Sequence, residues 1–222
     1  INTVSATYAR EIQTMAYGQG LDGFLRTRRA DLSGIVNGID YAEWNPAKDL
    51  HIAAHYAVEN MTGKEQFKVA LQERLQLPTS SAPLFCMVTR LVWDKGIDLV
   101  ASAIEQLMSR GIQLAILGSG EPRLQVALEQ AASRHPDQIS VALGYNEALA
   151  HQMYAGGDFF LMPSLTEPCG LSQMYSLAYG TIPVVRKTGG LSDTIVDASP
   201  VNIAKGKANG IVFDGAAPED LA

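Results

Sequence analysis

From Pro83 onward the chain alternates between short apolar runs and longer segments with helical spacing, and this pattern constrains the fold more than any other feature. Apolar runs short enough for strands occur at 84–88, 113–117, 139–143, 158–162, 182–185 and 210–213. Segments with the apolar spacing of helices lie between them, at 97–110, 122–134, 147–154 and 171–179, with a shorter one at 191–196. Strands that alternate with helices build βαβ units. The sequence therefore predicts a doubly wound, parallel α/β sheet with helices on both faces.

The first part of the chain lacks this alternation. A short helix is expected around Arg10 to Ile12, an amphipathic helix at 64–75, and a turn at Asn37-Gly38-Ile39-Asp40. We place a domain boundary near residues 34–38. Because the sequence begins at Ile1 and not at a methionine, we expect a fragment of a longer protein.

Charge and hydropathy exclude several partners. The formal net charge is −6, and the densest basic cluster is flanked by acids: it comprises Arg26, Arg28 and Arg29, with Asp22 and Asp31 beside them. No basic face for nucleic acid is expected from this pattern. The apolar runs are too short to span a membrane. We expect the two cysteines, Cys86 and Cys169, to be free thiols in a reducing cytoplasm.

Open parallel sheets bind ligands beyond the carboxyl ends of their strands, so the loops after each predicted strand are the candidate site. The first of these loops carries Arg90 and Lys95, and Gly96 follows them. A guanidinium fork and a mobile ammonium suit a diphosphate. Two solvated surface charges, with Asp94 paired to Arg90, are the alternative.

The next two loops carry weaker signals. Gly118 and Gly120 allow a close backbone approach to a ligand, but Arg123 stands where the dinucleotide fingerprint needs a third glycine. An ordinary tight turn explains them equally well. Tyr145 could stack on a planar base. The alternative is that Tyr145 packs under its own loop.

The loop after the strand at 158–162 gives the sharpest signal. It reads Glu167-Pro168-Cys169-Gly170-Leu171-Ser172 and runs into a predicted helix. The start of a helix presents unpaired amides and a positive dipole to an anion, and Ser172 adds a hydroxyl. Glu167 could bind sugar hydroxyls or oppose a developing positive charge. We interpret Cys169 as a small packed thiol.

Several motifs occur in a fixed order: R-x4-K-G at 90–96, G-x-G at 118–120, G-Y at 144–145, E-P-C-G-L at 167–171 and T-G-G-L at 188–191. This series resembles the C-terminal, Rossmann-like domain of retaining GT-B glycosyltransferases. The segments 3–11, 37–40, 44–46 and 167–171 resemble bacterial glycogen synthases and plant starch synthases in particular. Tyr175 stands where many other retaining GT-B enzymes carry a second glutamate, which fits the synthase branch.

The resemblance implies roles for the motif residues. Arg90, Lys95 and Glu167 would be catalytic, the two cations at the distal phosphate and leaving group and the acid at the donor glucose. The substrate-binding residues would be Gly118 and Gly120 near the nucleotide, Tyr145 on adenine, and Cys169, Gly170, Leu171 and Ser172 around the phosphate oxygens. Residues 1–36 would be the remnant of an N-terminal acceptor domain, and 37–222 a nucleotide-sugar-binding domain truncated at its C-terminus.

The activity implied is transfer of glucose from ADP-glucose to the non-reducing end of an α-1,4-glucan, with retention, in the cytoplasm or, in a plant, the plastid. We expect no metal and no cofactor. The fragment alone, without the acceptor domain, would only bind the nucleotide sugar. A related GT-B transferase that uses UDP-glucose and a non-catalytic nucleotide-binding module stay open as alternatives. An oxidoreductase domain has only the incomplete G-x-G in its favour.

Overall fold

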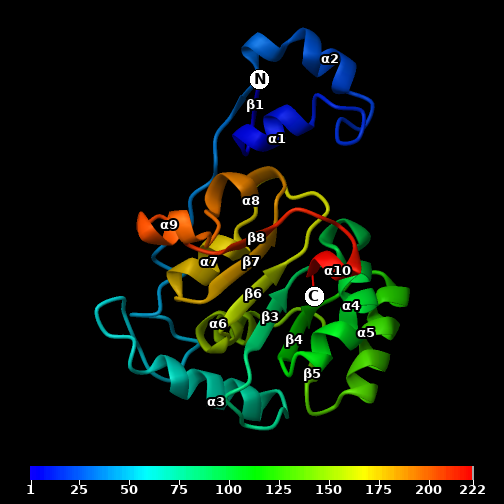
Figure 1. Cartoon of the computed structure of the whole chain (residues 1–222). Coiled ribbons are helices and arrows are strands. Elements are labelled where there is room, and N and C mark those ends of the chain that lie inside the picture. Colours follow the sequence, from blue (N-terminus) through cyan, green and yellow to red (C-terminus); the bar gives the residue numbers. More distant parts are fainter. Residues whose placement is uncertain (222) are drawn as a thin grey trace.

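A computed structural model describes residues 1–221 and confirms the predicted α/β class (Figure 1). Six strands form one sheet in the order β5-β4-β3-β6-β7-β8, and every neighbouring pair is parallel. The strands are β3 (Leu84–Val88), β4 (Gln113–Gly118), β5 (Ile139–Leu143), β6 (Phe159–Met162), β7 (Ile182–Arg186) and β8 (Ile211–Phe213). The order reverses between β3 and β6, which is where a doubly wound sheet opens its ligand crevice.

Helices cover both faces of the sheet, as Figure 1 shows. They are α3 (Lys64–Arg74), α4 (Ile97–Ser109), α5 (Pro122–Arg134), α6 (Glu147–Gly156), α7 (Ser172–Ala178), α8 (Gly189–Thr194), α9 (Pro200–Ala204) and α10 (Pro218–Leu221). Successive strand residues point to opposite faces. Cys86 and Leu117 therefore pack with α3 and α6, whereas Met87 and Ile116 pack with α4 and α5. The two cores lie back to back across the sheet.

The predicted element boundaries are close to the observed ones. Four helices differ. α8 begins at Gly189, two residues before the expected start, and the first helix of the chain, Ala6–Glu11, begins four residues before the expected Arg10. α9 and α10 have no predicted counterpart. α9 is a five-residue helix whose first turn is capped by the Ser199 hydroxyl and begins with Pro200. A helix this short has too few turns to show an apolar period, so only its cap could have revealed it.

The N-terminal residues form a small separate layer above α8 (Figure 1). It contains a parallel pair, β1 (Asn2–Thr3) and β2 (Ser33–Gly34), with α1 (Ala6–Glu11) and α2 (Asp22–Thr27). Side chains join α1 to the sheet domain: the Asp193 carboxylate accepts bonds from the Thr7 amide at 2.8 Å and hydroxyl at 2.6 Å. The division at residues 36 and 37 stays a prediction.

The remaining structural predictions concern the membrane and the thiols. None of the helices in residues 1–221 is long and apolar enough to cross a membrane. Cys86 and Cys169 are both free and buried, as predicted. Burial raises the pKa of the Cys86 thiol to about 12, because the interior disfavours the thiolate.

Candidate functional site

Two adjoining cavities open at the carboxyl edge of the sheet, where the order of strands reverses. The first, of about 170 Å³, is lined by Lys95, Glu167, Gly170, Leu171 and Ser172, and we call it the glutamate cavity. The second, of about 190 Å³, is lined by Arg90, Gly118, Gly144 and Tyr145, and we call it the tyrosine cavity. Val88 and Thr89, at the end of β3, line both. The fold thus gathers eight of the ten predicted site residues from four loops.

Lys95 and Glu167 form an ion pair in the glutamate cavity. Lys95 Nζ lies 2.8 Å from Glu167 Oε2, and the side chains are only 14% and 11% exposed. The Ser164 hydroxyl donates to the same oxygen at 3.2 Å. Gly96 turns the chain after Lys95 with a left-handed φ of 69°, packed so tightly that a Cβ would overlap the Pro163 carbonyl. The cation and the acid are therefore positioned by the fold before any ligand arrives.

The start of α7 forms another wall of the glutamate cavity. Its N-terminal boundary residue, Leu171, makes no side-chain cap, and first-turn amides of a helix lack intrahelical partners. Gly170 enters the helix with φ of 71°, a backbone that favours glycine. Gly170, Leu171 and Ser172 can therefore present donors to an anion beside the Lys95 ammonium.

Cys169 and Gly120 are the two predicted residues that line neither cavity. Cys169 is 6% exposed, and Gly190 of α8 packs against its backbone so closely that a Cβ there would overlap the Cys169 carbonyl. The packed thiol expected for Cys169 is thus what the structure shows. The residue supports the loop and does not face the cavity.

The two glycines of the G-x-G loop serve chain packing. A Cβ on Gly118 would overlap the carbonyl oxygen of Thr89, and one on Gly120 would overlap that of Leu91. The Leu91 amide donates to Ser119 O at 2.8 Å across the same contact. Both glycines make room for the neighbouring loop, as the alternative of an ordinary tight turn expects. Gly118 also lines the tyrosine cavity, and a close approach of this loop to a ligand stays a prediction.

The side chains of Tyr145 and Arg90, which line the tyrosine cavity, make few contacts. Tyr145 is 88% exposed, so the alternative that it packs under its loop is wrong. The Arg90 side chain is 72% exposed, with one guanidinium nitrogen 3.9 Å from an Asp94 carboxylate oxygen. Exposed pairs at this separation contribute little. Both side chains are free to turn towards a ligand.

Sequence reasoning missed residues that border the site. A wider cleft of about 870 Å³ lies beside Arg90 and Lys95 and is also lined by Tyr8, Tyr17 and Arg186. Arg186 stands at the carboxyl end of β7, and its Nη1 donates to the Leu165 carbonyl at 3.1 Å. Its position at a strand end was the signal available in the sequence. Both tyrosines belong to the N-terminal layer. Tyr8 lies in the segment 3–11 that resembles the synthases, whereas nothing local marks Tyr17.

Glu11 of α1 caps the loop that precedes α8. Its Oε1 accepts from the Gly189 amide at 2.9 Å and from the Thr188 hydroxyl at 3.2 Å. The N-terminal layer therefore fixes the T-G-G-L turn through a carboxylate at the start of a helix.

The sequence matches two known protein families. The family described as glycosyl transferases group 1 matches residues 72–222, and the starch synthase catalytic domain matches residues 1–27. The chain belongs to the group 1 glycosyl transferases. The resemblance to bacterial glycogen synthases and plant starch synthases is confirmed within that family.

Individual relatives agree with this assignment. A glycogen synthase of Thioalkalivibrio sulfidiphilus is 51% identical over 100% of the chain and 46% of the relative, and one of Anaeromyxobacter sp. is 53% identical over 89% and 42%. The solved catalytic domain of starch synthase IV from Arabidopsis thaliana, bound to ADP and acarbose, superposes with a TM-score of 0.92 at 40% identity. That match covers 99% of this chain and 45% of the starch synthase chain. The chain thus spans less than half the length of these relatives.

Proposed function

We propose that the chain is the donor-binding half of a glucosyltransferase that moves glucose from ADP-glucose to the non-reducing end of an α-1,4-glucan, with retention. The relatives named glycogen synthase, and the likeness to a starch synthase bound to ADP and acarbose, support this. The chain spans 46% of the first of these relatives. Alone, without an acceptor domain, it binds the nucleotide sugar and transfers no glucose.

The proposal assigns the leaving diphosphate to the glutamate cavity and its rim. Lys95 and residues 170–172 line this cavity, and the exposed Arg90 side chain lines the adjoining one. Preorganised donors aimed at developing charge stabilise a transition state at little reorganisation cost. These groups can neutralise the phosphates without a metal, so we keep the expectation that the transfer of glucose needs no metal and no cofactor.

Glu167 is assigned to the glucose. A sugar that loses its diphosphate develops positive charge near the anomeric carbon, and a nearby carboxylate opposes that charge. Lys95 and Ser164 hold the carboxylate oxygen Oε2 in place. Tyr145, exposed beside Gly118, would take the adenine by stacking.

One observation carries the proposal: the Lys95–Glu167 ion pair shares a cavity with the start of α7, and that cavity adjoins the exposed Tyr145. Calorimetric titration with ADP, UDP and GDP tests it. We expect ADP to bind most tightly and Lys95→Ala to weaken it by roughly 1.5–3 kcal/mol, the contribution of a charge-assisted contact.

The matched control is Lys207→Ala, which removes an equal charge from an exposed position after α9. Equal ADP affinity in wild type and Lys95→Ala would overturn the assignment of Lys95. Tighter binding of UDP than of ADP would instead support the UDP-glucose transferase.

A further inference from the structure

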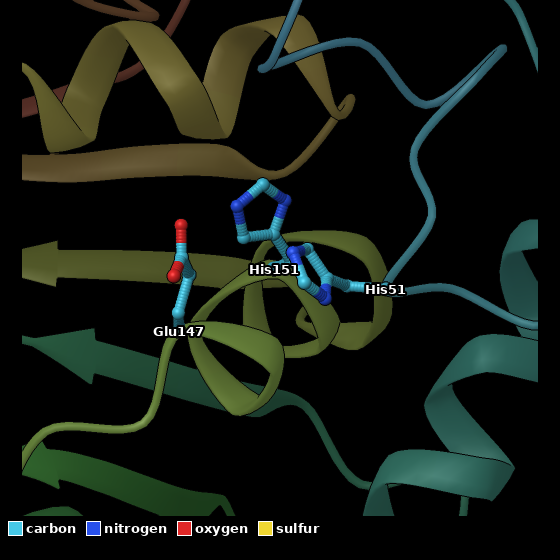
Figure 2. Close-up of side chains that lie close together, drawn as sticks. All are labelled: His51, Glu147 and His151. Carbon is cyan, nitrogen blue, oxygen red and sulfur yellow. The ribbon is translucent and has the colours of Figure 1, made fainter.

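Three potential metal ligands meet outside the candidate site. His51 lies in the segment that connects the N-terminal layer to α3, and Glu147 and His151 lie on α6. One ligand atom of each residue lies within 4.8 Å of the other two. Glu147 and His151 are four residues apart on one helix, so their side chains share a face. Figure 2 shows the two imidazole rings close together, with a ring nitrogen of His151 on the side of the Glu147 carboxylate.

Hydrogen bonds select one tautomer of His151. Its Nδ1 lies 2.8 Å from Oδ2 of Asp49, a buried carboxylate that also accepts from the Tyr179 hydroxyl. The other oxygen, Oδ1, accepts from the His51 amide at 2.7 Å, so both oxygens of Asp49 act as acceptors. A carboxylate accepts only, so Nδ1 carries the proton. The lone pair of His151 is therefore on Nε2.

That lone pair has no partner among the residues that the structure describes. His151 is 1% exposed, and Nε2 is buried without a hydrogen bond among the described residues. Trp44 stacks on the ring with centroids 4.0 Å apart and holds it in place. A buried acceptor left without a hydrogen bond destabilises the folded state, so such an atom requires an explanation.

We propose that His51, Glu147 and His151 bind one divalent transition-metal ion of the zinc class. Two imidazoles and a carboxylate are a ligand set that zinc accepts, with a fourth position left to water. Imidazole favours zinc, nickel and cobalt over magnesium and calcium. Asp49 supplies the carboxylate that metal-binding histidines use to orient the ring and fix its tautomer.

The position gives the ion a structural role. The ion would join the connecting segment to the first turns of α6, and α6 begins two residues after Tyr145. It would add a cross-link beside the Asp49–His151 bond and satisfy the unpaired Nε2. Binding should therefore raise the thermal stability of the chain, because only the folded state brings the three ligands together.

The test is calorimetric titration of the untagged, chelator-stripped chain with ZnCl2, and separately with MgCl2. We expect one zinc per chain and no magnesium. Glu147→Gln and His51→Gln should each weaken zinc binding by at least roughly 10–100-fold, which is the cost of losing a residue that only orients a metal ligand. His135→Gln is the matched control, since His135 pairs with Glu105 through Nε2 at 3.2 Å and lies outside the cluster. It should bind zinc as the wild type does.

Glu147 is exposed, so its substitution removes a ligand without disturbing the core. Thermal melts in chelator check that each variant folds. If His51→Gln does not fold, the result for Glu147→Gln decides the test. Cobalt absorption in the visible range should appear with the wild type and disappear with Glu147→Gln. No zinc binding by the wild type, or equal affinity in Glu147→Gln and His135→Gln, would overturn the proposal.

Discussion

The glutamate and tyrosine cavities share a wall at Val88 and Thr89 but differ in how much is arranged before a ligand arrives. In the first, Lys95 and Glu167 are nearly buried and already paired. In the second, Tyr145 and Arg90 are largely exposed, and Arg90 has only a distant acid beside it. Lys95 and Glu167 are preorganised, because reorganising charged groups during a reaction is costly. Tyr145 and the Arg90 guanidinium would instead be ordered by the ligand when it binds.

The largest effect is expected when Lys95 is removed, which tests whether the glutamate cavity is preorganised. Lys95→Met leaves the Glu167 carboxylate without its cation in a site only 11% exposed, so we expect the free energy of unfolding to fall by roughly 3 kcal/mol. Urea denaturation of the chain measures this loss.

The double variant Lys95→Met/Glu167→Gln separates stability from binding. It should recover most of the lost stability, because no uncompensated charge remains, yet it should not recover ADP affinity. If stability does not fall in the single variant, the pair is solvated and the glutamate cavity is no more preorganised than its neighbour.

Glu167→Gln tests whether preorganisation serves the reaction, in a protein extended to the full length of the relatives. An interaction made mainly in the transition state should lower kcat, by roughly 100-fold, with little change in KM for ADP-glucose. Steady-state kinetics beside a thermal melt distinguishes this from a structural role. A near-normal kcat with a lowered melting temperature would remove Glu167 from the catalytic residues.

Tyr145→Ala tests the open cavity. We expect ADP affinity to fall by about 1–2 kcal/mol from lost stacking, while pyrophosphate affinity stays unchanged. Competition calorimetry with both ligands reads the difference. A matched loss for the two ligands would mean that Tyr145 shapes the loop and does not contact the base. Tyr145→Phe should bind ADP as the wild type does, since the ring is retained.

The smallest effect is expected for Arg90→Ala on stability. Because the guanidinium is 72% exposed and 3.9 Å from Asp94, its loss should change the free energy of unfolding by less than about 0.5 kcal/mol. ADP binding should still weaken. Urea denaturation and calorimetry on the same preparation check both. A stability loss as large as that of Lys95→Met would mean that the two cavities do not differ in preorganisation.

Much of the site could be predicted because parallel strands carry their carboxyl ends to one edge. Arg90, Tyr145 and Glu167 each follow a strand, so the fold class alone brings their loops together. What could not be predicted is the contact between them. The Lys95–Glu167 bond spans 72 residues, and no local pattern encodes which cation reaches which acid. The packing role of Gly118 could not be predicted either, because the residue that it packs against, Thr89, lies in another loop.

The sequence by itself determined the α/β class, the places of the strands and the family, because apolar period and motif order are local properties of the chain. Only the tertiary structure decided which side chains lie next to one another and which are exposed. It paired Lys95 with Glu167, exposed Tyr145, and carried His51 to within ligand distance of Glu147 and His151, about a hundred residues further along the chain. Contacts between distant segments depend on how whole elements pack, and each element's packing is set by all of its neighbours at once.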